Sequence, residues 1–181
     1  MPTQTVTTSP ARVAIEKTRP DLAVQTGLTA KNGFAVGRGD VVGVITASGL
    51  ARKRSRAAVT GTAFSTGTAT GSVDDASVFV AGDVLKNAAG TTVGTILSIA
   101  ANVITLTGNA AVNVATAANV FASDGSEVAK AIADEGSDGT GDTPIRTFIG
   151  GYLDESLCLR LDATAKSELG GASVAGGIFK F

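Results

Sequence analysis

The chain has 181 residues, of which 17% are charged and 4% are aromatic, and its formal net charge is −1. This length indicates one domain, or one domain with an insertion, and the near-neutral charge gives no electrostatic reason to expect nucleic-acid binding. The sequence has no His and one Cys, so His-dependent catalysis and an intramolecular disulfide are excluded. We therefore expect a protein that is not an enzyme and has no cofactor or metal.

The N-terminal segment, residues 1–25, is predicted to be an extended arm. Its first twenty residues are polar and rich in Thr, and Pro2, Pro10 and Pro20 prevent regular strand pairing along the whole segment. Such a segment buries too little apolar surface to fold alone. Its Thr and Val residues nevertheless favour extended backbone, which can add as a strand to the sheet edge of a partner.

Short β-branched runs predict a β-rich domain over residues 26–181. Strands are expected at 41–46, before a turn at 47–49, and at 77–80. The clearest hairpin joins 93–99 to 103–107 through Ala100–Asn102. Four side chains of its first strand are expected to point the same way: Val93, Thr95, Leu97 and Ile99.

Two short sequences form a weak internal repeat of a turn followed by a strand. They are Gly39-Asp40-Val41-Val42 and Gly82-Asp83-Val84-Leu85, and coincidence also explains their similarity.

One helix carries clear signals. Asp124 can cap it, Glu127 stands three residues later as in a capping box, and Val128, Ala131 and Ile132 fall on one helical face. The glycine-rich segment 136–142 then forms a loop. The remaining expected elements are strands at 143–153 and 157–161, a short helix at 163–169 and a last strand at 178–181.

Several residues with reactive or charged side chains have competing interpretations. Cys158, between two leucines, is expected to be a small buried side chain in a strand, and a nucleophile is the alternative. The basic cluster Arg52, Lys53, Arg54 and Arg56 indicates a solvated loop beside a strand, or a contact with an acidic partner surface.

Two further motifs suggest functions that the residue patterns do not favour. Asp134, Glu135, Asp138 and Asp142 lack the spacing of an EF-hand, so a solvated acidic loop is expected. The tripeptide that starts at Arg38 matches a cell-adhesion motif, but its Gly-Asp pair is also an ordinary turn before a strand.

Three stretches, in this order, carry a family resemblance. They are the segment from Gly39 to Gly49, the segment from Asp124 to the acidic loop, and the segment from Ile149 to Leu157 with the later Gly176-Gly177-Ile178. Together they resemble the lambda-type bacteriophage head decoration proteins. The resemblance covers residues 28–49 and 121–181, and the region of about 72–120 is predicted to be an inserted β-rich module.

The resemblance implies an α+β, β-rich fold with a mixed α/β subdomain. It implies a homotrimer at the three-fold sites of the outer capsid surface, where it stabilises the expanded head. The major capsid protein is then the partner, bound by the arm as an added strand through Thr5, Val6, Thr7 and Thr8. We expect no small-molecule substrate, no direct nucleic-acid contact and no membrane partner. Without a visible export signal, synthesis in the host cytoplasm is expected.

Two other classes remain open from the sequence. One is another virion component, such as a tail-tube protein. The other is a β-rich adhesin or carbohydrate-binding module, against which the low aromatic content counts, because aromatic side chains stack on sugars.

Overall fold

The computed structural model describes residues 24–171 and 179–180, so residues 1–23 of the predicted arm lie outside the described residues. The described chain is β-rich, which confirms that part of the predicted fold class. Its elements are β1 (Val24–Ala30), β2 (Val41–Val44), β3 (Ala51–Lys53), β4 (Arg56–Ala58), β5 (Thr70–Ser72), η2 (Ala76–Val78), β6 (Val84–Asn87), β7 (Thr92–Ala100), β8 (Val103–Leu106), β9 (Asn119–Ala122), β10 (Ala131–Ala133), β11 (Thr143–Tyr152), η3 (Glu155–Leu157), α2 (Ala163–Gly171) and β12 (Phe179–Lys180).

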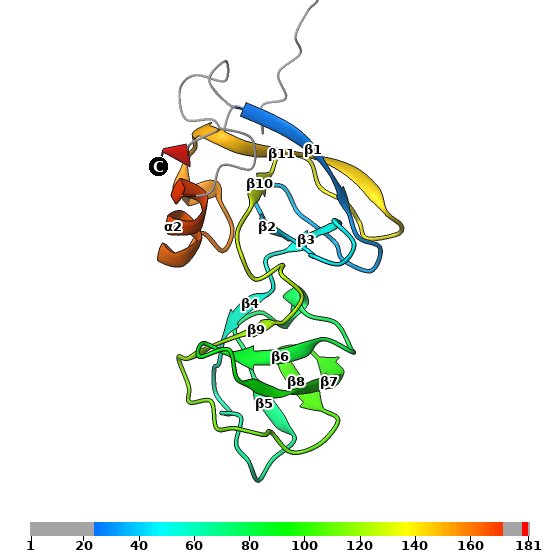
Figure 1. The fold of residues 1–181 in the computed structure, drawn as a ribbon, viewed down its shortest axis with the longest axis vertical. Coiled ribbons are helices and arrows are strands. Elements are labelled where there is room, and N and C mark those ends of the chain that lie inside the picture. The colour runs from blue at the N-terminus through cyan, green and yellow to red at the C-terminus, as the bar shows by residue number, and fades with distance from the viewer. Residues whose placement is uncertain (1–23, 172–178, 181) are drawn as a thin grey trace, which may run out of the picture. The chain divides into compact units, whose positions relative to one another are not determined.

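The chain forms two compact units (Figure 1). The first consists of Met1–Val42 and Ala129–Phe181, and the second is the continuous segment Gly43–Val128. The second unit is therefore an insertion in the first. The predicted module at about 72–120 lies within it, and the unit also includes β3 and β4.

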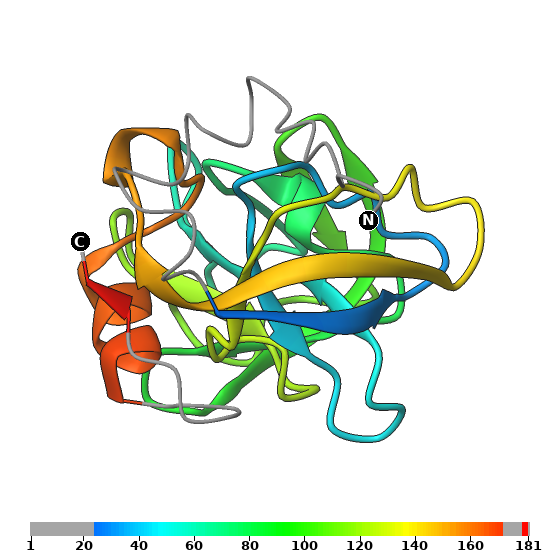
Figure 2. The same cartoon turned by 90° about the horizontal axis from the view of Figure 1, so that it is seen from above.

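The first unit is built on the long strand β11. β1 pairs with it antiparallel from Val24 opposite Gly150 to Ala30 opposite Thr143, and the two strands lie side by side in Figures 1 and 2. β10 pairs with both β11 and β2, and β12 adds in parallel to the end of β11. Buried side chains from these strands, from α2 and from the segments next to them form its core: Val41, Ala129, Ile132, Phe148, Leu153, Cys158, Ala165 and Leu169.

Helix α2 confirms the short helix expected at 163–169. The Asp162 side chain accepts a hydrogen bond from the Ala165 amide at 2.6 Å, as an N-cap residue does. Ala165 and Leu169 are four residues apart, so they share the buried face of the helix.

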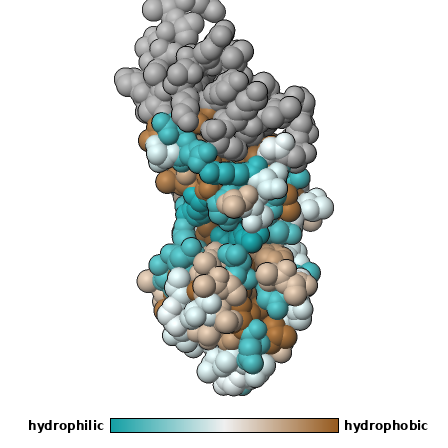
Figure 3. All heavy atoms as spheres, turned by 90° about the vertical axis from the view of Figure 1, so that its left-hand side faces the viewer, coloured by the Kyte–Doolittle hydropathy of each residue, from teal (hydrophilic) through white to brown (hydrophobic). Residues whose placement is uncertain are grey.

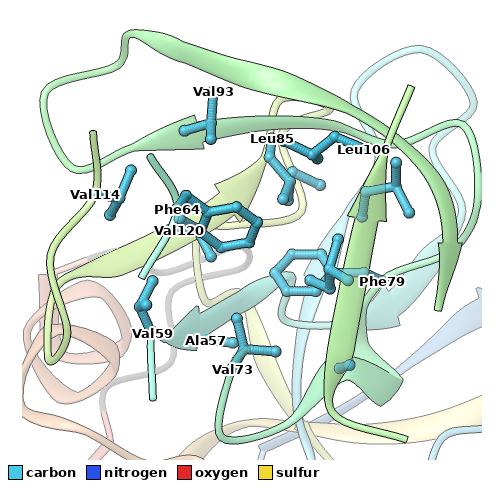
Figure 4. Close-up of a cluster of buried hydrophobic side chains, with 14 of the residues drawn as sticks. Ala57, Val59, Phe64, Val73, Phe79, Leu85, Val93, Leu106, Val114 and Val120 are labelled. Atoms are coloured by element: carbon cyan, nitrogen blue, oxygen red, sulfur yellow. The ribbon is translucent and has the colours of Figure 1, made fainter. Parts of the chain in front are cut away.

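The second unit is a closed barrel with the strand order β4-β9-β6-β7-β8-β5. The residues after β4 and β5 close it, because Thr60 N donates to Ser72 O at 2.8 Å and Val59 bridges Val73. Inside, Phe64 and Phe79 point toward aliphatic side chains from the surrounding strands (Figure 4). Gly71 leaves room for the Phe64 ring, since a Cβ there would lie 2.6 Å from ring carbons.

The predicted hairpin is confirmed, and its side-chain pattern is only partly right. β7 pairs antiparallel with β8, but the register shifts between Ile96 and Ser98. The pairing of β7 with β6 also shifts, between the pairs Leu85–Gly94 and Lys86–Thr92, so Val93 is an extra residue there. Such a bulge changes the alternation of the residues beyond it. Val93 and Ile96 are consequently both buried, whereas Leu97 is 58% exposed.

The internal repeat noted in the sequence forms the same turn twice. Asp40 N donates to Gly37 O and Asp83 N to Val80 O, both at 3.2 Å. The same two carboxylates accept from the amides three residues earlier, at 2.7 Å and 3.0 Å. Gly39 and Gly82 have φ angles of 85° and 92°, which explains why glycine precedes each aspartate.

The helix predicted from Asp124 is wrong. The cap-like hydrogen bonds do form, because the Asp124 carboxylate accepts from Ser126 N and Glu127 Oε2 accepts from Gly125 N, both at 2.9 Å. The backbone turns at Gly125, where φ is 95°, and continues into the fully buried strand β10 instead of a helix.

Two expected strands are also replaced by single 3-10 turns. Residues 77–80 overlap η2, which Asp75 caps by accepting from Ser77 N. Residues 157–161 overlap η3 only at Leu157, and Leu159 forms an isolated bridge with Asp40. Asp154 caps η3 in the same way, through Ser156 N. In both places an aspartate side chain satisfies backbone amides locally, so a short turn competes successfully with strand pairing.

The chain leaves the first unit and returns to it at neighbouring points. Lys130 N donates to Val42 O at 2.9 Å, and this bond connects the residues just before and just after the inserted second unit. Within the second unit, Gly43 lies against Ser126, and a Cβ on Gly43 would be 1.9 Å from Ser126 O. Glycine is therefore required sterically at the start of the insertion.

Candidate functional site

The basic cluster singled out in the sequence lies where β3 leads into β4. Arg52 and Arg54 are 1% and 2% exposed, so a solvated loop is wrong for these two residues. Lys53 and Arg56 are partly exposed. The proposed contact between this cluster and an acidic partner stays a prediction, and Lys53 and Arg56 are the members placed to make it.

Arg52 is the centre of an ion-pair cluster inside the second unit. Its Nη1 and Nη2 donate to the two carboxylate oxygens of Asp83 at 3.2 Å and 2.8 Å, and Nη1 also donates to Asp124 Oδ2 at 3.0 Å. Nη2 additionally contacts the main-chain oxygen of Val78. A guanidinium fits such a planar, two-carboxylate arrangement because its donors have a fixed fork geometry.

A second layer of polar contacts extends this cluster. The Ser126 hydroxyl lies 2.7 Å from the Ser55 hydroxyl and also contacts Asp124 Oδ1. Arg54 Nε donates to the main-chain oxygen of Glu127 at 2.9 Å. The buried polar groups of 52–55 are thereby tied to the turn at 124–127, which lies some seventy positions further along the chain.

The ionisation of Asp124 reflects these contacts. Burial raises the pKa of Asp124, but hydrogen bonds from Ser126 and the charge of Arg52 outweigh it, so the net pKa lies below the ordinary value of 3.8. The carboxylate is therefore charged at neutral pH and paired with a charged guanidinium. This geometry links three segments of the second unit, and the guanidinium of Arg52 is occupied by carboxylates of the same unit.

An open surface hollow adjoins the same turn. It is lined by Thr46, Ala47, Ser123, Asp124, Gly125 and Glu127. Glu127 is held by the Gly125 amide and Asp124 by Arg52, so both carboxylates already have partners within the unit. Across residues 24–171 and 179–180, no group of three or more His, Cys, Asp or Glu residues is placed to hold a metal ion.

The acidic residues of the segment 134–142 in the first unit differ in burial and in their partners. Asp134 is 4% exposed and accepts from Arg38 at 3.0 Å and Arg146 at 2.9 Å, so the solvated interpretation is wrong for it. Asp138 caps a local turn through Thr140, and Asp142 accepts from Asn32 N at 2.8 Å. Glu135 shares Arg146 with Asp134, at 3.4 Å, whereas Asp138 and Asp142 make contacts of their own.

The adhesion-like tripeptide is a structural turn. Its aspartate, Asp40, is 1% exposed and pairs with Arg160 at 2.6 Å, and Arg38 pairs with Asp134. A carboxylate buried in this way is not available to a receptor. The expectation of a turn before a strand is confirmed, since β2 begins at the next residue.

Cys158 is buried against the core of the first unit, as expected, although it follows a 3-10 turn and not a strand. Its thiol donates to Asp154 O at 3.3 Å. Burial, with the negative charges of Asp154 and Glu155, raises the pKa of the Cys158 thiol to about 11. The thiolate needed for nucleophilic chemistry is therefore strongly disfavoured at neutral pH.

Sequence reasoning found the arginines but missed their partners. Asp83 and Asp124 lie 31 and 72 positions from Arg52, and no local pattern links residues at such separations. The repeated Gly-Asp turn was the available signal, because it placed Asp83 at a structured position. The predicted arm residues Thr5, Val6, Thr7 and Thr8 lie outside the described residues.

No family model, curated protein or solved structure matches the chain. No helix within the described ranges is long and apolar enough to cross a membrane.

Proposed function

We propose that this chain is a bacteriophage capsid decoration protein that binds the outer surface of the expanded head as a trimer and stabilises it. The proposal rests on the family resemblance and is supported chiefly by the division of the chain. The resemblance covers 28–49 and 121–181, and the first unit is assembled from nearly the same two flanks, 24–42 and 129–180. The intervening segment forms a unit of its own, as an addition to a simpler decoration domain would.

A main-chain contact gives further support. The first and third stretches of the resemblance meet in the first unit, where Leu159 N donates to Gly39 O at 2.8 Å and Val41 N donates to Leu159 O at 3.2 Å. Leu159 lies two residues after the third stretch, and Leu157 within that stretch lies against Gly39, where a Cβ would be 2.4 Å from Leu157 O. Stretches separated by more than a hundred residues in the sequence are thus parts of one local structure.

The proposed attachment uses the segment that precedes β1. β1 is paired with β11 along its whole length, so an arm before it starts from a fixed point. Three such arms on a trimer would bind at raised effective concentration once the first had docked. A ligand that binds the assembled shell and not its dissociated subunits stabilises the shell by mass action.

The test combines oligomeric state with head binding. The full chain should form a trimer by light scattering and co-sediment with expanded heads of the source phage that lack their own decoration protein. A Met1–Pro10 deletion should stay trimeric and lose binding. Hexameric rings or tubes would favour a tail-tube protein instead, and a monomer without affinity for heads would refute the proposal.

A matched pair of substitutions isolates the added strand from the mere presence of the arm. Val6→Pro removes a main-chain donor and disrupts strand pairing, whereas Val6→Thr keeps a β-branched residue. The Pro variant should bind heads more weakly than the Thr variant. Equal binding would refute the strand assignment for Thr5–Thr8 while leaving head binding itself intact.

A further inference from the structure

Three partly exposed side chains form one row across the outside of the barrel in the second unit. Arg56 on β4 and Lys86 on β6 both lie opposite Phe121, which is on β9 between them. Leu85 and Val120, which directly precede Lys86 and Phe121, are buried in the barrel core. Because successive side chains of a strand point to opposite faces, the Arg56–Phe121–Lys86 row faces outward.

The row places a positive charge on each side of an aromatic ring. Neighbouring strands lie about 4.8 Å apart, so the backbone positions of the two cations are about 10 Å apart, with Phe121 between them. The row continues to Thr92 on β7, which lies opposite Lys86 and is exposed. Side chains that lie opposite one another on one face of a sheet are close enough to contact the same ligand. The row therefore presents a guanidinium, a ring, an ammonium and a hydroxyl in that order.

The two cations of the row are not used inside the unit. Asp83 and Asp124 belong to the segments that adjoin β6 and β9, and both of these carboxylates pair with Arg52. Within the part of the chain that the structure describes, neither Arg56 nor Lys86 forms an ion pair, and Arg56 Nε has no hydrogen-bond partner. Both charges are therefore available to an external anion.

Little other charge surrounds the row. Residues 57–73 and 87–123 contain no Asp, Glu, Lys or Arg, and much of the second unit is white to brown in the face seen in Figure 3, as neutral and apolar residues are coloured. β4, β6 and β9 carry no acidic residue, so no carboxylate on these strands competes with an incoming anion. The local potential at the row is therefore positive, although the net charge of the chain is −1.

We propose that the Arg56–Phe121–Lys86 row binds a nucleotide, with the base stacked on Phe121 and the phosphates held by the two cations. Aromatic side chains stack on bases of any identity, and positive charges beside them follow the phosphates. An acidic peptide would use the cations and leave the ring without a partner, so it fits only part of the row. A free nucleotide and a single strand of nucleic acid share this chemistry, and binding measurements separate them.

The expectation of no nucleic-acid contact was drawn from the net charge of the whole chain, and the local charge of this row overrides it. Binding at the row requires no capsid, so it is independent of the proposed function.

A tryptophan reporter tests the stacking on the full chain. The sequence has no Trp, so Phe121→Trp makes a single reporter on the row. Its fluorescence should be quenched by a short oligothymidylate and not by polyglutamate, because only the nucleic acid has bases to stack. ATP should quench more than inorganic tripolyphosphate. Quenching by ATP as strong as that by the oligonucleotide would identify a free nucleotide as the ligand, and much weaker quenching by ATP would identify a single strand.

The salt dependence of binding tests the two charges. Anisotropy of a labelled oligothymidylate with the wild-type chain should give a slope of about −1.4 for log K against log [NaCl], since each of two phosphate contacts contributes about −0.7. Lys86→Gln should reduce the slope to about −0.7. Phe121→Leu should keep the slope and weaken binding at least about fivefold, because it removes the stacked ring.

The matched control is Lys130→Gln, since Lys130 is also partly exposed but lies in the first unit. It should change neither affinity nor slope, and circular dichroism checks that each variant is folded. Equal affinity of Phe121→Leu and the wild type, equal effects of Lys86→Gln and Lys130→Gln, or an unquenched reporter would each overturn the proposal. If polyglutamate displaces the labelled strand as well as unlabelled oligothymidylate does, the row binds an acidic polypeptide, and the nucleotide assignment is refuted.

Discussion

Replacing Arg52 with Met removes the centre of the buried ion-pair cluster and should strongly destabilise the second unit. The change deletes the two bonds to Asp83, the bond to Asp124 and the contact with Val78 O. Removing one partner of a buried ion pair typically costs about 3–5 kcal/mol. The carboxylate side chains are 12% and 27% exposed and can regain some hydration, so we expect about 3 kcal/mol.

The cost is measured by urea denaturation, with hydrogen exchange mass spectrometry to assign the transition to residues 43–128. Lys53→Met is the matched control, because Lys53 is the next cation along the chain and is partly exposed. This change should cost less than about 1 kcal/mol. Arg52→Lys should fall between the two, since an ammonium keeps the charge but lacks the fork that reaches both carboxylates. Equal costs for the Met variants at 52 and 53 would refute the reasoning.

Three further outcomes are expected. Gly43→Ala should destabilise the fold by about 1–3 kcal/mol through its clash with Ser126 O, whereas Gly67→Ala, with no atom nearby, should be close to neutral in urea denaturation. When alkylation at neutral pH is followed by mass spectrometry, Cys158 should react at least about 100-fold more slowly in the folded chain than in the unfolded chain, because folding raises its pKa to about 11 from 9.0. Equal rates would contradict its burial. The pKa of Asp124 is lowered on folding, so its stabilising contribution is present above pH 3.8 and is lost as the pH falls through the folded value. The Asp124→Asn variant should therefore lose less stability than the wild type between pH 7 and pH 3. An equal loss in the two proteins would refute this.

Local sequence patterns predicted the elements whose hydrogen bonds and burial are set by nearby residues. β2, the β7–β8 hairpin, β11 and α2 all occur where β-branched runs, a short link or a glycine stop indicated them. The error within the hairpin came from a bulge. Its position depends on the pairing of β7 with β6, and the alternation of β7 alone does not reveal it.

The candidate site was harder to predict because its contacts are long-range. Four basic residues within a five-residue segment have the composition of a solvated loop. Arg52 is nevertheless buried beside carboxylates from distant turns, and Arg54 is buried beside the main-chain oxygen of Glu127. The false helix at Asp124 has a related cause. Its capping residues do bond to local amides, but strand pairing with β2 and β11 decides the path of the residues after them.

The adjacent exit and return of the chain at Val42 and Lys130 make the second unit exchangeable. Since Lys130 N already bonds to Val42 O, the two ends of the first unit are close enough for a short linker to join them. The same junction could accept a foreign domain whose termini lie close together. The first unit would then be a platform for displaying other folded cargo, provided that the linker also replaces β3, which lies between β1 and β2 in the sheet.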